Sequence, residues 1–376
     1  MRSGGERAPA PGSVTAMEAG FVGRRVLGAC AAVALALGAG ACGSSGPTRL
    51  VVAGWGGQFD EATRTAYLDG FDATAHADTR LVDAPGEQLA RIRAQEAAHR
   101  VAWDAVDSLD GGAAYRLYHE GLLAKLPPAL YARLRRELGA ANITPFGFAH
   151  GGIADVMVCD TARARRCPER IADFYDIAHF PGTRMLGAID PLETAATAEV
   201  AKGWRITETD VNPIDTPSLF DVFTAVKPAV RAYWRTGAQQ LQLMRGGTVD
   251  IGLMWSNLAY QLAAAGAPLK IVWAGGAYEP RYWAVLAGAP HARAAFGLLE
   301  WIADHPAAEA RWAQLTRASV PNPAARAHLP ASLVAQLADN PSNRAQTGMP
   351  DIEWYSLYGG ELDTEFMKMV AGHSYI

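Results

Sequence analysis

The sequence predicts an α/β protein with two lobes, and three observations support this fold class. The chain has 376 residues, which is more than one hydrophobic core usually organises. Half of its residues are hydrophobic and 19% are charged, an ordinary globular composition. Short apolar runs alternate with stretches of helical character, which is typical of mostly parallel sheets joined by helices. Ligands of such sheets bind beyond the carboxyl ends of the strands.

The expected elements follow from this alternation. A buried strand at 50–55 ends at Gly56-Gly57, which turns the chain into a helix whose apolar face includes Phe59 and Tyr67. Further strands are expected at 79–82, 101–109, 152–159, 249–255, 269–274 and 282–287. Helices are expected at 86–99, 220–234, 238–245 and 291–304. Polar and aromatic residues collect where three of the strands end, so a cleft lined by these residues is predicted.

The N-terminus predicts export. Arg24 and Arg25 precede an apolar run at 26–41, which is shorter than the roughly 20 residues needed to cross a bilayer as a helix. We therefore expect a signal peptide at 1–41. Small residues directly before Cys42 resemble the bacterial lipobox, which predicts a lipidated Cys42 and a tether at 42–48. The alternative is ordinary signal cleavage nearby, which would leave an unmodified cysteine.

The remaining cysteines predict a disulfide. Cys30 lies within the signal peptide and Cys42 at the lipidation site, so only Cys159 and Cys167 are left for the folded body. In an oxidising compartment we expect these two to pair, contributing about 2 to 3 kcal/mol to stability. The alternative is two free thiols.

Composition and motifs argue against several function classes. The formal net charge of −4 makes nucleic acid an unexpected partner. The sequence lacks G-x-S-x-G, H-E-x-x-H, C-x-x-C and a phosphate loop, and its nine histidines show no metal-ligand spacing. We therefore expect no catalytic residues, no metal and no cofactor. A rival interpretation is a secreted α/β serine hydrolase with Ser108 or Ser256 as its nucleophile, because both serines lie near strand ends.

Several motifs in the same order resemble one family. They are the opening strand with its Gly-Gly turn at 51–71, Ala-Asp-Phe-Tyr-Asp at 172–176, Phe-Pro-Gly-Thr-Arg at 180–184, Asn-Pro-Ile-Asp at 212–215, the run at 227–239, Gly-Thr-Val-Asp leading to Trp255, and the run at 282–290. Together they resemble the extracellular solute-binding proteins of ABC importers, specifically the spermidine/putrescine-binding family. The resemblance covers almost the whole chain after Trp55.

This resemblance implies a fold, a mode of action and partners. The implied fold is a periplasmic-binding-protein fold of the class II type, a monomer with its ligand cleft between two lobes that close on binding. Lobe 1 is expected at 49–147 plus 278–318, and lobe 2 at 148–277 plus 319–376. The implied partners are a polyamine and the permease and ATPase subunits of an importer, with the protein held at the periplasmic or cell surface through its lipid. A sensor that binds the same solute is a further possibility.

The resemblance also implies how a polyamine is held. Carboxylates receive its ammonium groups, and Asp190 and Glu193 match the family's acidic pair, although Asp-Pro-Leu-Glu also reads as a helix cap. Trp255 and Trp55 match aromatic contacts at strand ends, with core packing as the alternative. Asp110 could receive an amine or only cap the next helix. The full set of expected ligand contacts is Trp55, Gly57, Gln58, Ser108, Asp110, Asp190, Glu193, Trp255, Asn257 and Trp283.

One departure from the family pattern weakens the polyamine assignment. Trp283, preceded by Arg281 and Tyr282, stands where classical spermidine binders carry a carboxylate. If Arg281 faces the cleft, it repels a cation and attracts a carboxylate or phosphonate. The alternative ligand is therefore an amino acid derivative, an opine or a phosphonate. The alternative is that Arg281 is a solvated surface charge.

Overall fold

The computed structural model describes residues 46–189, 191–206, 215–320, 322–349 and 351–372. Their strands are β1 (Thr48–Gly54), β2 (Ala77–Asp83), β3 (Ala105–Asp110), β4 (Ile143–Thr144), β5 (Gly147–Asp160), β6 (Arg184–Gly187), β7 (Val230–Trp234), β8 (Ile251–Trp255), β9 (Leu269–Val285) and β10 (Thr347–Gly348). The expected signal peptide at 1–41 and Cys42 lie outside the described residues.

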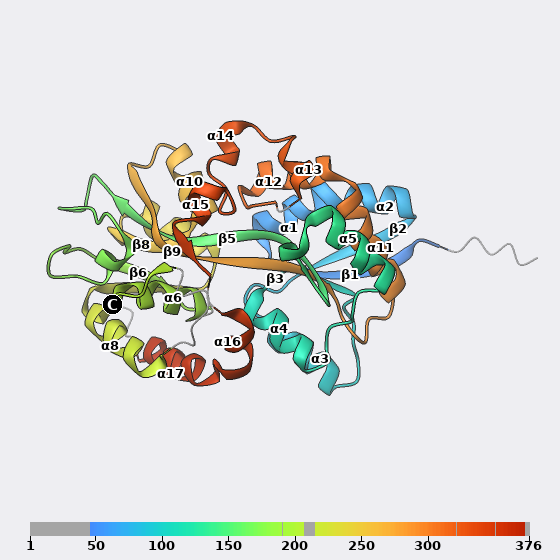
Figure 1. The fold of residues 1–376 in the computed structure, drawn as a ribbon, viewed down its shortest axis with the longest axis horizontal. Coiled ribbons are helices and arrows are strands. Elements are labelled where there is room, and N and C mark those ends of the chain that lie inside the picture. The colour runs from blue at the N-terminus through green and yellow to red at the C-terminus, as the bar shows by residue number, and fades with distance from the viewer. Residues whose placement is uncertain (1–45, 190, 207–214, 321, 350, 373–376) are drawn as a thin grey trace, which may run out of the picture. The chain divides into compact units, whose positions relative to one another are not determined.

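The helices connect these strands and pack around them (Figure 1). They are α1 (Gly57–Thr63), which continues through a π-helical turn at Arg64–Leu68 into α2 (Asp69–Ala75), then α3 (Gln88–Ala97), α4 (Gly111–His119), α5 (Pro128–Leu138), α6 (Pro191–Ala201), α8 (Thr216–Val226), α9 (Gly237–Arg245), α10 (Ser256–Ala264), α11 (Ala292–Asp304), α12 (Pro306–Thr316), α13 (Pro323–Arg326), α14 (Ala331–Val334), α15 (Pro341–Arg344), α16 (Ile352–Tyr358) and α17 (Gly360–Ala371). None of the described helices is both long and apolar enough to cross a membrane.

All described strands belong to one mixed sheet in the order β2-β1-β3-β9-β5-β8-β6-β7, with β10 beside β9 and β4 beside β5. Pairing is parallel at both ends, where β1 joins β2 and β3, and β6 joins β7 and β8. In the middle it is antiparallel, because β9 pairs with β3 and β5, and β5 pairs with β8. The expectation of mostly parallel strands therefore holds only at the two ends.

The two longest strands join the ends of the sheet. The first part of β5 pairs with the last part of β9 beside β3, and its later part pairs with β8. Figure 1 shows β5 and β9 running through the centre of the molecule. The predicted lobe boundaries at 147/148 and 277/278 fall within these strands. We call the β2-β1-β3 side the first half of the sheet and the β8-β6-β7 side the second half.

Two predicted elements were wrong in kind or extent. The helix expected at 220–234 ends at Val226, and β7 follows at Val230–Trp234. Pro228 has no backbone N–H to continue the helix, and the β-branched and aromatic residues after it favour a strand. The strands expected at 269–274 and 282–287 are one strand, β9, whose polar middle segment is fully or nearly fully buried. The polar residues between the two apolar runs therefore belong to the strand and not to a loop.

The C-terminal helices contact both halves of the sheet. On α17, Phe366 packs against Phe223 of α8, their ring centroids 5.5 Å apart. On the other side, Asp363 pairs with Arg116 of α4 at 2.6 Å, and the Arg116 guanidinium lies 4.6 Å from the Tyr355 ring centroid. The end of the chain is therefore anchored to elements of both halves.

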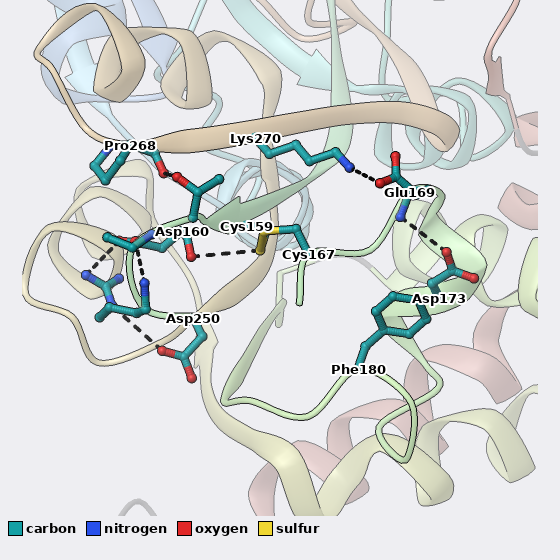
Figure 2. The surroundings of a disulfide bond; sticks show 12 residues. Cys159, Asp160, Cys167, Glu169, Asp173, Phe180, Asp250, Pro268 and Lys270 are labelled. Atoms are coloured by element: carbon teal, nitrogen blue, oxygen red, sulfur yellow. Dashed lines mark hydrogen bonds and ion pairs between the residues drawn. A yellow bond between two sulfur atoms is a disulfide. The ribbon is translucent and has the colours of Figure 1, made fainter. Parts of the chain in front are cut away.

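A disulfide closes a loop at the end of β5. Cys159 and Cys167, the pair expected to be oxidised, are bonded with their Cα atoms 5.7 Å apart. Figure 2 shows the ion pair of Lys270 with Glu169 beside this bridge. The loop carries arginines, of which Arg163 pairs with Asp160 at 2.7 Å. The bridge thus fixes a charged surface loop to the buried end of a central strand.

Candidate functional site

Two tryptophans from opposite halves of the sheet meet at strand ends. Trp55 follows β1 and Trp255 ends β8, and their ring centroids lie 6.0 Å apart with the planes at 59°. Trp234, at the end of β7, lies 5.3 Å from Trp255. After Trp55 the chain turns through Gly56 and Gly57, both with positive φ, a conformation that glycine adopts without strain. This turn leaves Trp55 half-buried and within reach of the other half.

Three cavities share Trp55 and Trp255 in their walls. The charged cavity, about 10 Å³, is lined by Trp55, Asp110, Asp155, Gly187, Ile189, Glu193, Trp234, Trp255 and Arg281. The aromatic cavity, about 10 Å³, is lined by Trp55, Phe59, Ser108, Gly151, Gly152, Ile153, Trp255, Arg281, Trp312 and Ala318. The outer cavity, about 320 Å³, is lined by Trp55, Gly56, Gly57, Gln58, Phe59, Asp83, Pro85, Thr236, Gly237, Ala238, Leu241, Trp255 and Leu258. Of the three, the outer cavity has the volume of a small-solute site, and each of the other two has room for about one water molecule.

Arg281 is the cation of this site. It lies on β9, is 7% exposed, and lines both the charged and the aromatic cavities. Its guanidinium carbon lies 5.5 Å from the Trp55 ring centroid, which is cation–π distance. Its Nη2 donates to Glu193 Oε1 at 3.1 Å and lies 3.2 Å from Glu279 Oε2. A buried guanidinium thus faces the cavities while two carboxylates compensate its charge.

The carboxylates around Arg281 differ in their partners. Glu279 Oε1 accepts the backbone N–H of Gly111 at 2.7 Å, at the start of α4. Asp155 lies on β5, and neither of its carboxylate oxygens has a hydrogen-bond partner among the described residues. Burial raises the pKa of both Asp155 and Glu279 above their usual range, and the positive charge of Arg281 opposes this effect. The charged cavity is therefore lined by one cation and by the acidic residues Asp110, Asp155 and Glu193.

A buried cluster of hydrogen-bonded side chains around Asp107 adjoins the aromatic cavity. Asp107 Oδ2 accepts the hydroxyl of Thr63 at 2.7 Å, and Asp107 Oδ1 accepts that of Ser108 at 3.0 Å. Oδ1 also contacts Nδ1 of His150, whose ring packs 4.0 Å from that of Trp312. Ser108 has a φ of 55°, which is uncommon for a residue other than glycine. This cluster holds the end of β3 where Ser108 enters the cavity wall.

The serines of the rival hydrolase interpretation have other roles in this geometry. Ser108 Oγ donates to Asp107, and Ser256 Oγ accepts the backbone N–H of Ala154 at 3.4 Å. Among the described residues, neither serine is hydrogen-bonded to a histidine, the arrangement that activates a serine nucleophile. Across the described ranges, no three His, Cys, Asp or Glu side chains gather as metal ligands.

Most of the expected contact residues lie in the cavity walls. Trp55, Gly57, Gln58, Ser108, Asp110, Glu193 and Trp255 line at least one of the three cavities. Asp110 caps α4 as expected, because its Oδ1 accepts the N–H of Ala113, and the residue also lines the charged cavity. Glu193 binds Arg281 as described above.

Two expected contacts lie elsewhere in the fold. Asn257 is 2% exposed, and its Nδ2 donates to the carbonyl of Thr316 at 3.0 Å. Trp283 is fully buried, with its ring 5.3 Å from that of His150. Neither lines the described cavities. Asp190 lies outside the described residues.

Sequence reasoning missed several residues of the walls. Asp155 is a lone carboxylate inside the apolar run expected as a strand at 152–159, and a charged residue in a buried strand is itself a signal of function. The sequence predicts a helix that includes Trp234 and an apolar helix face that includes Phe59. It assigns no role to Trp312. Arg281 was recognised only as a residue that would matter if it faced the cleft, which it does.

The chain was compared with protein families and with known proteins. Residues 73–343 match the model of the bacterial extracellular solute-binding protein family. A gamma-aminobutyric acid-binding protein of Pseudomonas aeruginosa is 27% identical over 329 residues, which cover 86% of this chain and 91% of that protein.

Solved structures are similar in fold. An ABC transporter substrate-binding protein from Bradyrhizobium japonicum has a TM-score of 0.77 and 24% identity, covering 86% of this chain and 99% of that one. A binding protein of A. tumefaciens R10 in complex with agropinic acid has a TM-score of 0.75 and 20% identity with the same coverage. These similarities confirm the predicted two-lobed α/β fold class.

A spermidine/putrescine-binding protein of Streptococcus pneumoniae is less similar, with a TM-score of 0.63 and 15% identity over 86% of this chain and 99% of that one. The specific resemblance to polyamine binders is therefore weaker than the resemblance to the wider family.

Proposed function

This chain belongs to the bacterial extracellular solute-binding protein family, and from that premise we propose that it captures a small zwitterionic amino acid derivative for an ABC importer. The expected class of solute is a compound such as γ-aminobutyrate or an opine, with a cationic amine and a carboxylate. The gamma-aminobutyric acid-binding relative supports this class over polyamines, and the fold neighbour bound to agropinic acid supports a solute that carries a carboxylate.

The observation that carries the proposal is the position of Arg281. A polyamine carries only positive charge, so it has no group that can pair with the buried guanidinium in the cavity wall. A carboxylate of the ligand can instead pair with the guanidinium in a charge-assisted, bidentate geometry. The amine of the same ligand then finds the acidic residues of the charged cavity and the faces of Trp55 and Trp255.

The mode of capture follows from which halves of the sheet supply the residues of the cavity wall. Trp55 and Asp110 come from the first half of the sheet, and Glu193 and Trp255 from the second, while Arg281 lies on a strand that joins them. A solute that touches both sides stabilises the closed form by the contacts it gains there over an open form. A permease that recognises the closed form would then accept only loaded protein.

Isothermal titration calorimetry with the mature protein tests the solute class. We expect saturable binding of γ-aminobutyrate, and no heat with putrescine or spermidine. In Arg281→Gln, affinity for the zwitterions should fall at least 100-fold, because the charge-assisted pair is lost. Arg235→Gln, a change at an exposed arginine outside the three cavities, is the matched control and should bind as the wild type does. Tighter binding of putrescine or spermidine than of any zwitterion would return the assignment to polyamines.

We also propose that the protein acts outside the cytoplasmic membrane as a lipoprotein. Family membership supports export, and the small residues before Cys42 support an anchor at that cysteine. Mass spectrometry of the protein from membranes should show a diacylglycerol-modified N-terminus at Cys42. Release of Cys42→Ser into the soluble fraction is the expected companion result, and an unmodified N-terminus would contradict the anchor.

A further inference from the structure

Asp155 is a buried carboxylate with no bonding partner. It lies near the middle of β5, where its backbone pairs with Trp255 of β8 and Ala277 of β9. The residue is 1% exposed, and neither Oδ1 nor Oδ2 has a hydrogen-bond partner in the part of the chain that the structure describes. Its side chain lines the charged cavity. A buried carboxylate without a partner is costly, so its retention at a cavity wall needs a reason.

The nearest cation does not fill this role. Arg281 lies close enough to lower the pKa of Asp155, but it donates a hydrogen bond to Glu193 and forms an ion pair with Glu279. Two carboxylates thus already share that guanidinium. The acceptor capacity of Asp155 remains open toward the cavity.

A complementary donor belongs to another residue that lines the same cavity. The indole Nε1 of Trp255 has no hydrogen-bond partner among the described residues, although the residue is only 2% exposed. Buried indole N–H groups usually find a partner. The lining of the charged cavity therefore includes one residue with an open acceptor and one with an open donor, which suits a solute that carries a cation at one point and an anion at another.

We propose that Asp155 accepts the ammonium group of the solute and is the residue that selects amine-bearing ligands. This inference rests on the proposed function, and it assigns the amine contact to a residue of the central strand β5. The faces of Trp55 and Trp255 flank the same cavity and attract a cation as well. The carboxylate of the solute then meets Arg281 and the Trp255 N–H.

The decisive experiment compares two variants and two probes by calorimetry. The probes are γ-aminobutyrate and 4-hydroxybutyrate, which differ only in whether the terminal group is an ammonium or a hydroxyl. Wild-type protein should prefer γ-aminobutyrate by at least about 100-fold, because a charge-assisted bond is replaced by a neutral one. In Asp155→Asn, which keeps the shape of the side chain, this preference should fall below about 5-fold.

Glu199→Gln is the matched control. Glu199 on α6 is also 1% exposed, and neither of its carboxylate oxygens has a hydrogen-bond partner in the described ranges, but it does not line the charged cavity. This variant should bind γ-aminobutyrate within about 3-fold of the wild type, as expected for a change with no ligand contact.

The Tm of the empty protein is a second readout. Replacing Asp155 should raise Tm if the residue binds the solute and lower Tm if the residue stabilises the fold. Removing an unpaired buried carboxylate relieves its desolvation cost, so Asp155→Asn should raise Tm by about 2 °C while binding is lost. A fall in Tm with γ-aminobutyrate affinity and preference retained would overturn the inference. If the wild type itself bound no amine-bearing probe, the proposed function would fail together with the inference. If the wild type bound and Asp155→Asn bound equally well, only the inference would fail.

Discussion

Two aspartates on different strands of the same sheet show how differently buried charge can be used. Asp107 ends the apolar part of β3 and Asp155 lies within β5, and each is only 1% exposed. Asp107 accepts hydrogen bonds from Thr63 and Ser108 and contacts His150, whereas Asp155 has no hydrogen-bond partner among the described residues. Burial alone therefore does not distinguish a scaffold residue from a binding residue, and the inventory of hydrogen bonds does.

The surroundings of the two aspartates agree with this division. The Asp107 cluster is closed by aromatic rings, because the ring of His150 packs against those of Trp312 and Trp283. The indole N–H of Trp312 also donates to Thr63 at 3.2 Å. Around Asp155, by contrast, the polar groups face a cavity. The first region fixes strand ends, and the second leaves bonds to be made by a guest.

The largest effect on stability is expected from replacing Arg281, the cation of the cavity region. Arg281→Met should destabilise the protein by about 3 to 5 kcal/mol, because Glu193 and Glu279 lose the charge that compensates them. Arg281→Lys keeps the charge but not the planar fork and should recover part of this loss. Urea unfolding measures both variants. Equal stability of Arg281→Met and wild type would show that the carboxylates are neutral without the guanidinium.

A smaller loss is expected in the partnered region. Asp107→Asn should cost about 2 to 3 kcal/mol, because at least one buried donor among Thr63, Ser108 and His150 loses its acceptor. Affinity of the folded protein for γ-aminobutyrate should stay within about 3-fold of the wild type, as measured by calorimetry. A large loss of affinity without loss of stability would erase the distinction between Asp107 and Asp155.

The open donor of the cavity region gives a more modest effect. Trp255→Phe keeps an aromatic face but removes the indole N–H, so affinity for γ-aminobutyrate should fall about 10-fold. Trp273→Phe is the control, because Trp273 Nε1 already donates to the Tyr260 hydroxyl at 3.1 Å and lines none of the three cavities. Parallel titrations of the two variants make the measurement. Equal affinities would mean that the Trp255 N–H makes no bond to the solute.

The smallest effect concerns buried carboxylates away from the cavities. Burial raises the pKa of Glu199 and of Glu309 to about 8 from a usual value of 4.5. The folded protein therefore holds these protons more tightly than the unfolded chain does. Their stabilisation is fully present below pH 4.5 and is lost as the pH rises to about 8, so Tm should fall by a few degrees between pH 5 and 8.

Calorimetric scans of the empty protein across this range test the sign of the slope. Glu199→Gln and Glu309→Gln should each flatten it, because each removes one of the titrating groups. A Tm that rises with pH would contradict the assignment of raised pKa values to these two residues.

Much of the fold could be predicted from the sequence, because β1 and β8 contain apolar runs that are followed by glycine or polar residues. The failures have physical causes. The helix expected at 220–234 was read from apolar density alone, which does not separate a helix from a strand that follows a proline. The strand β9 was divided because Glu279, Pro280 and Arg281 interrupt its apolar pattern.

The candidate site was predictable in part for the same reason. Trp55, Asp110, Glu193 and Trp255 stand at or beyond element ends, where ligands of α/β proteins are expected. Asp155 and Arg281 stand inside long strands, where the pattern rules favour apolar residues. Residues that break a local pattern in favour of binding are therefore the ones that pattern reading discards.

The place of β9 in the sheet also bears on how the chain reaches its native state. β9 lies between β3 and β5, yet its residues 269–285 are synthesised long after both neighbours. Until it arrives, the two flanking strands lack their shared partner, and sequence-distant pairing of this kind forms slowly. Completion of the sheet is thus postponed until about three-quarters of the polypeptide has been synthesised.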